Sequence, residues 1–256
     1  MRDDLGTPYD GPVESTRVVS LVPSLTEALA SVAPERVVGA TDWCTHPADL
    51  AVTRVRGTKN PDLAAIRALA PDVVVANQEE NRELDVRRLR ESGVTVWATR
   101  IETVPDAVAS MERLLHALGW RRPTWLDEAR RRWCGPLPPV ARTVVVPIWR
   151  DPWMVVGART FTSDLLRRLG WRNLYDGLGP DSLNAAGERY PHVEVADLDM
   201  AGADVALLPD EPYVFTATDG PDAFRRTPTE LISGRLITWY GPSLVEAAAL
   251  AHSPRR

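Results

Sequence analysis

The sequence predicts an α/β protein of two Rossmann-like lobes, each a parallel sheet covered by helices. Short runs rich in β-branched residues alternate with helical segments along the whole chain. The runs 72–76 and 204–208 each continue from an aspartate into unbroken apolar residues, as expected of strands covered on both faces. Residues 134–139 are rich in glycine and proline and separate one such series from the next. At 256 residues the chain is long enough to bury two cores.

The first lobe, expected over 17–102, opens with a strand that Pro23 closes. Ser24 and Glu27 have the spacing of a capping box, which predicts that a helix starts there. Pro61 suits the first turn of another helix. The predicted strands are 17–22, 36–39, 72–76 and 94–97, and the predicted helices are 25–31, 61–69 and 82–91.

Residues 103–140 are predicted to form a helical linker between the lobes. Apolar residues recur at helical spacing over 104–118, Gly119 and Pro123 end that piece, and a second piece follows over 124–133. The second lobe is expected over 141–256. Its predicted strands are 143–146, 153–156, 204–208 and 236–239, and its predicted helices are 161–169 and 242–250.

Composition and charge exclude several classes of protein. Hydrophobic residues at 44% and charged residues at 25% are ordinary for a globular protein. A net charge of −5 argues against a nucleic-acid partner, which requires a basic surface. Neither a membrane span nor a secretory signal is found, because residues 1–16 lack a basic start and the apolar run 18–22 is too short. We therefore expect a loose tail over 1–16, no membrane partner and a cytoplasmic location.

Unusual side chains gather on the loops that follow the predicted strands, where open α/β sheets bind ligands. Aromatic rings interleaved with charges predict a cleft for a large, planar, partly charged ligand. The alternative is that the tryptophans pack surface between the lobes. The candidate ligand-binding residues are Trp43, Lys59, Glu79, Glu80, Trp149, Arg150, Trp153, Glu211, Tyr213, Trp239 and Tyr240.

The adjacent carboxylates Glu79 and Glu80 are expected to divide their roles. Two like charges side by side repel each other unless they are solvated or paired. One is expected to support the following helix, with Asn81 as its cap, and the other to serve the ligand or Lys59.

The motifs of catalysis are absent. The chain has no G-x-S-x-G elbow, P-loop, H-E-x-x-H or G-x-G-x-x-G. Asp42, Cys44 and His46 are at most a partial metal site, and no second cluster of histidines completes it. We therefore expect no catalytic residue, no bound metal and no enzyme activity. The alternative of an enzyme with Glu79, Glu80 or Cys44 as acid, base or nucleophile stays open, as does an interaction protein without a small ligand.

The motifs together resemble the helical-backbone, class III substrate-binding proteins of ABC importers, which carry cobalamin, haem and ferric siderophores. The closest resemblance is to a cobalamin-binding-like branch, parts of which lack export signals. The matching segments are V-S-L-V-P-S-L-T-E at 19–27, T-D-W-C at 41–44, G-T-K-N-P-D at 57–62, A-P-D-V-V-V-A-N-Q-E-E-N at 70–81, P-I-W-R-D-P-W at 147–153, E-P-Y-x-F at 211–215 and T-W-Y-G at 238–241.

The resemblance implies two lobes joined by one rigid helix, here 124–133, with a ligand held between them. The ligand it implies is a corrinoid, haem or ferric chelate, and no catalytic step is implied. Its transport members dock to their permease through one glutamate on each lobe. The matching positions here are Ala64 and Ala196, and the nearby Asp62 and Asp197 are two residues away on a helix, which turns a side chain by about 200°. We therefore expect no docking to a permease.

Overall fold

The computed structural model describes residues 1–252 and divides into two compact units. Unit 1 consists of Met1–Ile101, Pro105–Arg131 and Tyr240–Pro242, and unit 2 consists of Glu102–Val104, Arg132–Trp239 and the segment from Ser243 onward. Most of the segment expected as a helical linker, 103–140, belongs to unit 1, which includes Pro105–Arg131. The division falls inside the helix predicted over 124–133.

Unit 1 contains a five-stranded sheet in which every neighbouring pair is parallel, with strand order β3-β2-β1-β6-β7. The strand predicted over 72–76 is β6 (Val73–Asn77), and all of its residues are buried because helices cover both faces of the sheet. The strands are β1 (Val18–Ser20), β2 (Val37–Ala40), β3 (Thr53–Arg54), β6 (Val73–Asn77) and β7 (Val96–Thr99), and β4 (Arg56–Gly57) pairs with β5 (Asn60–Pro61) in a small antiparallel ribbon.

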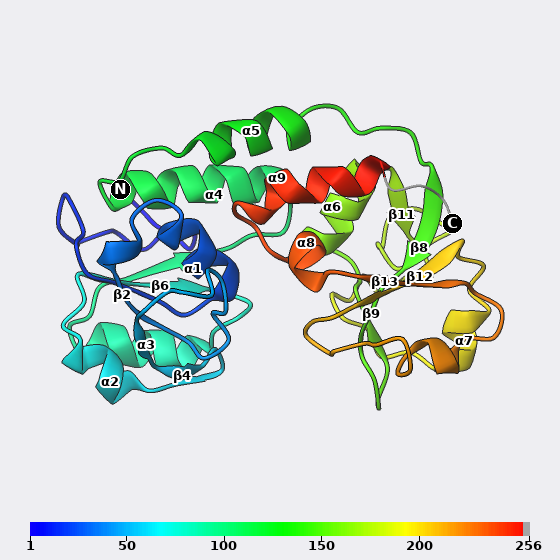
Figure 1. Ribbon diagram of the computed structural model, residues 1–256, viewed down its shortest axis with the longest axis horizontal. Coiled ribbons are helices and arrows are strands. Elements are labelled where there is room, and N and C mark those ends of the chain that lie inside the picture. Colours follow the sequence, from blue (N-terminus) through cyan, green and yellow to red (C-terminus); the bar gives the residue numbers. More distant parts are fainter. Residues whose placement is uncertain (253–256) are drawn as a thin grey trace. The chain divides into compact units, whose positions relative to one another are not determined.

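The helices of this part of the chain are α1 (Pro23–Ala30), α2 (Leu63–Ala68), α3 (Glu83–Glu91), α4 (Val104–Ala117) and α5 (Thr124–Trp133), with a short 3₁₀ turn at Pro34–Arg36. One face of the sheet packs Val19 and Val74 against Ile66 of α2 and Leu89 of α3. Figure 1 shows α4 on the opposite side of this sheet from α2 and α3. Successive strand residues point to opposite faces of the sheet, and the apolar side chains on these faces pack against the helices to form the core of unit 1.

Two predicted helix caps are wrong. Helix α1 starts at Pro23 rather than after Ser24, since the fixed φ of proline suits the first helical position, and its cap residue Val22 makes no side-chain bond. Helix α3 is preceded by Arg82, so Asn81 is not its cap. Helix α2 does have a side-chain cap. The Asp62 carboxylate accepts hydrogen bonds from the backbone N–H groups of Ala64 and Ala65 at 3.1 and 3.0 Å.

The first sixteen residues, expected as a loose tail, are folded onto unit 1. The Asp3 carboxylate is almost fully buried, and it accepts a bond from the Arg90 guanidinium at 3.0 Å and from the backbone N–H of Ala98 at 3.2 Å. The Asp4 carboxylate accepts bonds from Ser110 Oγ and Arg113. The acidic composition that suggested a solvated segment thus supplies acceptors that attach it to the lobe.

Unit 2 contains a four-stranded parallel sheet, with strand order β11-β8-β12-β13. The strands are β8 (Arg142–Val145), β11 (Trp171–Asn173), β12 (Val205–Pro209) and β13 (Thr229–Ile232), and β9 (Pro147–Trp149) pairs antiparallel with β10 (Met154–Val155). The two parallel sheets confirm the predicted fold class.

One predicted strand of unit 2 is wrong. The segment predicted as a strand over 236–239 lies mostly in the helix α8 (Gly234–Thr238), and the strand that completes the sheet is β13. Short apolar runs do not distinguish a buried strand from a short helix. Strand β13 carries Thr229 and Glu230, so its sequence is too polar to stand out.

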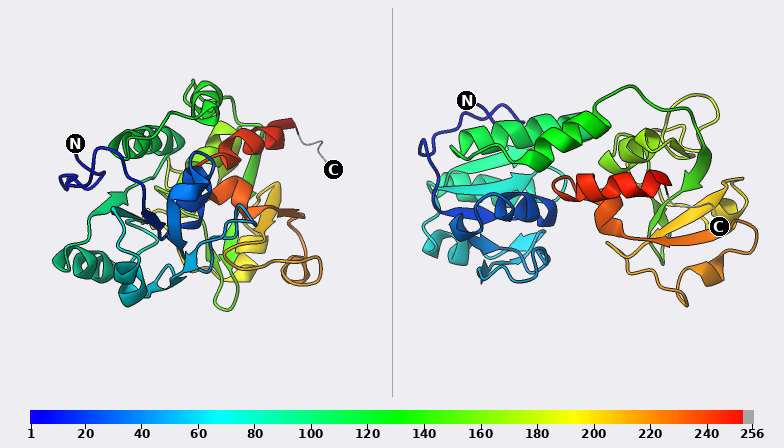
Figure 2. Two further views of the ribbon diagram at one scale, coloured as in Figure 1. Left: turned by 60° about the vertical axis from the view of Figure 1, so that its left-hand side comes forward. Right: turned by 45° about the horizontal axis from the view of Figure 1, so that its top comes forward.

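The remaining helices of unit 2 are α6 (Phe161–Arg168), α7 (Val195–Asp199) and α9 (Ser243–Ala247), with 3₁₀ turns at Pro221–Ala223 and Ala248–His252 (Figure 2). Thr160 caps α6 by accepting a bond from the backbone N–H of Ser163 at 3.3 Å. Val145, Ala206 and Leu198 pack together in the core beside α7. Within residues 1–252, no helix has the length and apolar character needed to cross a bilayer.

Candidate functional site

In unit 1 an amide network fixes the loop that follows β6. Asn77 Oδ1 accepts bonds from the backbone N–H groups of Glu79 and Glu80 at 2.8 and 3.3 Å, and its amide nitrogen donates to Thr99 Oγ1 at 3.0 Å. Asn81 accepts from the backbone N–H of Asn77 at 2.9 Å. Both asparagines are buried and their amides are bonded, so the loop at the carboxyl end of the sheet is held in one shape.

Four predicted site residues lie at this end of unit 1. Lys59 is exposed, and its ammonium donates to the backbone carbonyl of Glu79 at 2.5 Å. Trp43 is 67% exposed, which is unusual for so large an apolar side chain. Glu79 is exposed and Glu80 is half-buried. The part of these four residues in ligand binding stays a prediction.

Cys44 belongs to the core of unit 1. Its thiol is buried and lies 3.0 Å from Thr26 Oγ1 and 3.1 Å from Thr41 Oγ1. Burial raises the pKa of the Cys44 thiol, so the thiolate that a nucleophile or metal ligand requires is disfavoured. Among the described residues, no three His, Cys, Asp or Glu side chains are grouped so that they could hold a metal ion. Cys44 and Cys134 are both free thiols.

In unit 2 the loops after β8 and β12 build an aromatic cluster, which we define as Trp149, Trp153, Tyr213, Phe215 and Phe224. The Trp149 and Tyr213 rings meet edge to face with centroids 5.8 Å apart, and Trp149 is 44% exposed. Trp153 stacks on Phe215 with centroids 5.9 Å apart and is only 8% exposed. Trp153 is therefore the buried member of the cluster, contrary to the expectation that its ring faces a ligand. Trp149 keeps an open face.

The guanidinium of Arg150 is held by carboxylates of its own unit. It pairs with Asp219, and it forms a two-pronged bond with Asp222 at 3.0 and 2.9 Å. The Tyr213 hydroxyl donates to Asp219 at 2.7 Å, which ties the aromatic cluster to the same carboxylate. The Arg150 guanidinium lowers the pKa of Asp222 to about 2, so this carboxylate is ionised at neutral pH. Arg150 was expected to pair with the ligand, and it instead braces the loop that carries Trp149.

The last three predicted residues lie near α8. Trp239 and Tyr240 are buried and offer no open ring face, contrary to expectation. Glu211 accepts a bond from Thr238 Oγ1 at 3.0 Å. A Cβ on Gly234 would stand 2.3 Å from Glu211 Cγ and 3.0 Å from its backbone N and O, so only glycine allows this close approach. Glu211 therefore positions the start of α8.

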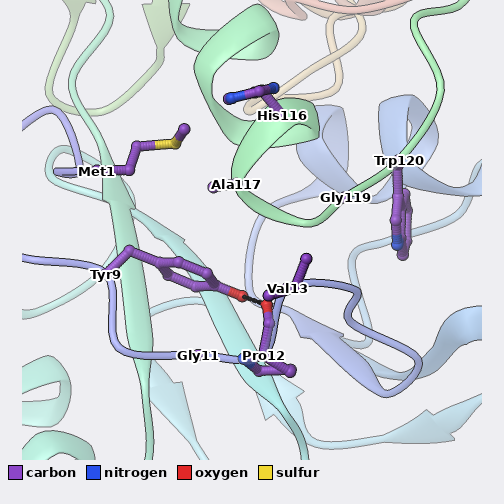
Figure 3. A pocket seen from close by; sticks show the side chains of 9 residues that line it. All are labelled: Met1, Tyr9, Gly11, Pro12, Val13, His116, Ala117, Gly119 and Trp120. Carbon is purple, nitrogen blue, oxygen red and sulfur yellow. Dashed lines mark hydrogen bonds between the residues drawn. The ribbon is translucent and has the colours of Figure 1, made fainter.

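A pocket of about 490 Å³ lies elsewhere in unit 1, between the amino-terminal segment and the end of α4 (Figure 3). Across it the Tyr9 hydroxyl donates to the Pro12 carbonyl at 3.3 Å. None of its lining residues is a predicted site residue, and none follows the carboxyl end of a strand. Its lining residues are Met1, Tyr9, Gly11, Pro12, Val13, His116, Ala117, Gly119 and Trp120.

Sequence reasoning missed the side chains that hold these loops in place. Asp219 and Asp222 lie 69 and 72 residues from Arg150 along the chain, and no motif links them. The run Thr218-Asp219-Gly220-Pro221 is a turn signal, and it could have identified the segment but not its partner. Asn77 lay inside a matched motif and was not singled out, because its role appears only when β6 and β7 are paired.

Comparison with models of known protein families finds no match. The chain is 26% identical over 107 residues to the vitamin B12-binding protein of Vibrio cholerae, which is 41% of this chain and 39% of that protein. The chain thus matches about two-fifths of the length of this curated relative.

Two solved structures share the fold over nearly the whole chain. The periplasmic vitamin B12 binding protein BtuF of Vibrio cholerae superimposes with a TM-score of 0.69 at 15% identity, covering 95% of this chain and 100% of that one. A periplasmic heme binding protein from Pseudomonas aeruginosa does so with a TM-score of 0.71 at 18% identity, covering 93% and 91%.

Both proteins are periplasmic, so the cytoplasmic location expected from the sequence is wrong by this comparison. That expectation depended on the first residues of the chain alone, which are part of the folded unit. The resemblance seen in the motifs is confirmed at the level of the fold: this chain has the two-lobe α/β fold of the helical-backbone, class III substrate-binding proteins.

Proposed function

We propose that this protein is a non-catalytic binding protein for a corrinoid, tetrapyrrole or other planar metal chelate. The observation that carries the proposal is the open face of Trp149, set edge to face against Tyr213 on a loop that two ion pairs brace. A rigid, exposed indole is a suitable surface for a flat apolar ring system. It lies where open α/β sheets bind their ligands, beyond the carboxyl ends of the strands.

The corresponding end of unit 1 supports the same proposal. Trp43 is exposed there, and the Asn77 and Asn81 amides hold the loops that carry Glu79 and Lys59. Exposed tryptophans on rigid loops at the ligand ends of both sheets are economical to explain as binding surface. The ligand position between the lobes that the resemblance implies stays a prediction.

The similar proteins support the class of ligand. One binds vitamin B12 and another binds heme, and both ligands are planar metal macrocycles. The buried, hydrogen-bonded Cys44 and its raised pKa argue against the enzyme alternative that used this thiol.

The test is a titration of the purified protein with cyanocobalamin and with haemin, followed by absorbance and tryptophan fluorescence. We expect saturable binding of at least one of them, and a Trp149→Ala variant is expected to bind about tenfold or more weakly, as for a buried aromatic contact. Trp125→Ala is the matched control, because Trp125 is a half-buried tryptophan on α5 of unit 1 and belongs to none of these loops. Failure of every macrocycle to bind, or equal losses in both variants, would contradict the proposal.

We also propose that this protein does not dock to a permease through the paired glutamates of the transport members. Ala64 on α2 and Ala196 on α7 occupy the matching positions, both are exposed, and alanine forms no ion pair. Asp62 is a poor substitute, since its carboxylate caps α2.

A pull-down with a class III importer from the same cell tests this second proposal. We expect no retention of the wild-type chain, and restored, salt-sensitive retention of an Ala64→Glu, Ala196→Glu double variant. Stoichiometric, salt-sensitive retention of the wild type would instead favour an importer component that delivers its ligand.

A further inference from the structure

Negative charges outnumber positive charges around Trp149, the exposed tryptophan of unit 2. The Arg150 side chain is 22% exposed, and its guanidinium is shared between Asp219 and Asp222. Asp151, which lies 3.8 Å from the same guanidinium, is 85% exposed. One cation therefore faces three carboxylates, and the surface beside Trp149 is acidic.

The polar donors of this surface face aspartates of their own unit. Arg150 donates to Asp222 through two nitrogens and to Asp219 through one of them. The Tyr213 hydroxyl donates to Asp219. A carboxylate on a ligand would compete with the aspartates for these donors, and it would meet like charge as it approached. An amide or a metal-centred positive charge meets neither obstacle.

We infer, on the basis of the proposed function, that Asp219 and Asp222 are specificity-determining residues that select planar metal chelates without peripheral carboxylates. The favoured ligand is a cationic or uncharged macrocycle with amide substituents. Arg150 is in this account a positioning residue for the Trp149 loop. The aspartates hold it in place and also compensate the positive charge that would attract an anionic ligand.

The experiment compares two corrinoids that share one ring system. Cyanoaquocobinamide carries amides and a net positive charge, and cyanoaquocobyrinic acid carries carboxylates in place of the amides. Each is titrated into the wild type, Asp219→Asn and Asp222→Asn by absorbance and fluorescence at low ionic strength. Asparagine keeps a hydrogen-bond acceptor and removes one negative charge. Glu230→Gln is the matched control, because it removes the same charge from a pair with Arg142 near the start of β13, at the other end of the sheet.

We expect the wild type to bind the cobinamide about tenfold or more tightly than the carboxylated ring. Each aspartate variant is expected to lower the ratio of the two affinities about threefold to tenfold. This is the effect of one charge at contact distance in a site that solvent partly screens. The Glu230→Gln ratio is expected to equal that of the wild type.

Equal affinity of the wild type for both rings, or preference for the carboxylated one, overturns the inference and leaves the proposed function intact. So does an unchanged ratio in both aspartate variants. Absence of binding by either corrinoid and by haemin contradicts the proposed function itself, and the inference fails with it.

Discussion

The two tryptophans that flank Arg150 are expected to respond in opposite ways to the same truncation. Trp153 is 8% exposed and stacks on Phe215, whereas Trp149 is 44% exposed. A fully buried aromatic side chain removes about 200 Å² from water, worth about 5 kcal/mol at about 25 cal/mol per Å² as an upper bound. Trp153→Ala should therefore cost about 3–5 kcal/mol of unfolding free energy, since it also leaves a cavity.

Trp149→Ala should cost much less, about 1–2 kcal/mol, because only about half of its surface is buried and water can fill the space. Urea unfolding followed by far-UV circular dichroism measures both without depending on the deleted fluorophore. Since two compact units need not unfold together, amide hydrogen exchange is used to assign the loss to unit 2. Ligand titration of the same variants gives the complementary result.

We expect Trp153→Ala to lose stability and Trp149→Ala to lose affinity for the ligand. If Trp149→Ala loses as much stability as Trp153→Ala, the open indole is a core residue and its assignment as a binding surface fails. The same conclusion follows if Trp149→Ala binds every ligand as tightly as the wild type.

Three further predictions concern buried or paired groups. Asp3→Asn should lower the unfolding free energy by about 1–3 kcal/mol, because a buried charged acceptor is weakened, and thermal unfolding measures it. A thiol reagent should modify exposed Cys134 rapidly and Cys44 only on unfolding, as mass spectrometry of the labelled peptides can establish. Bonding to Arg150 depresses the folded-state pKa of Asp222 to about 2, so its stabilising contribution is present above about pH 4 and is lost as the pH falls towards 2. Asp222→Asn should make acid unfolding over that range less steep.

Local patterns were sufficient for most of the fold. The helix predicted over 124–133 is α5 with the same bounds, and the apolar run 72–76 is the fully buried β6, shifted by one residue. Periodicity and breakers act over a few residues, so they can be read from one segment at a time. Strand β13 could not be identified this way, because it pairs with β12 through its backbone while its side chains are partly polar.

The site was predictable to the level of its loops and no further. Exposed Trp149 and Trp43 lie on loops that the sequence indicated, but Trp153, four residues beyond Trp149, is core. Which of two indoles on one hairpin faces inward depends on Phe215, a partner from a distant segment. Likewise, the ion pairing of Arg150 depends on carboxylates of the segment that follows β12, and no local sequence pattern identifies these partners.

The amino-terminal segment has a consequence beyond its contribution to stability. Strand β7 is the outermost strand of the first sheet, and its backbone groups on the outer side would be a template for strand addition by another chain. The Asp3 carboxylate accepts a bond from the N–H of Ala98, and the backbone N–H of Asp4 donates to the C=O of Ala98. The Asp4 carboxylate accepts a bond from the N–H of Arg100. These residues thus cover the β7 edge of the sheet with charge and irregular backbone, and both features disfavour pairing of that edge with another chain.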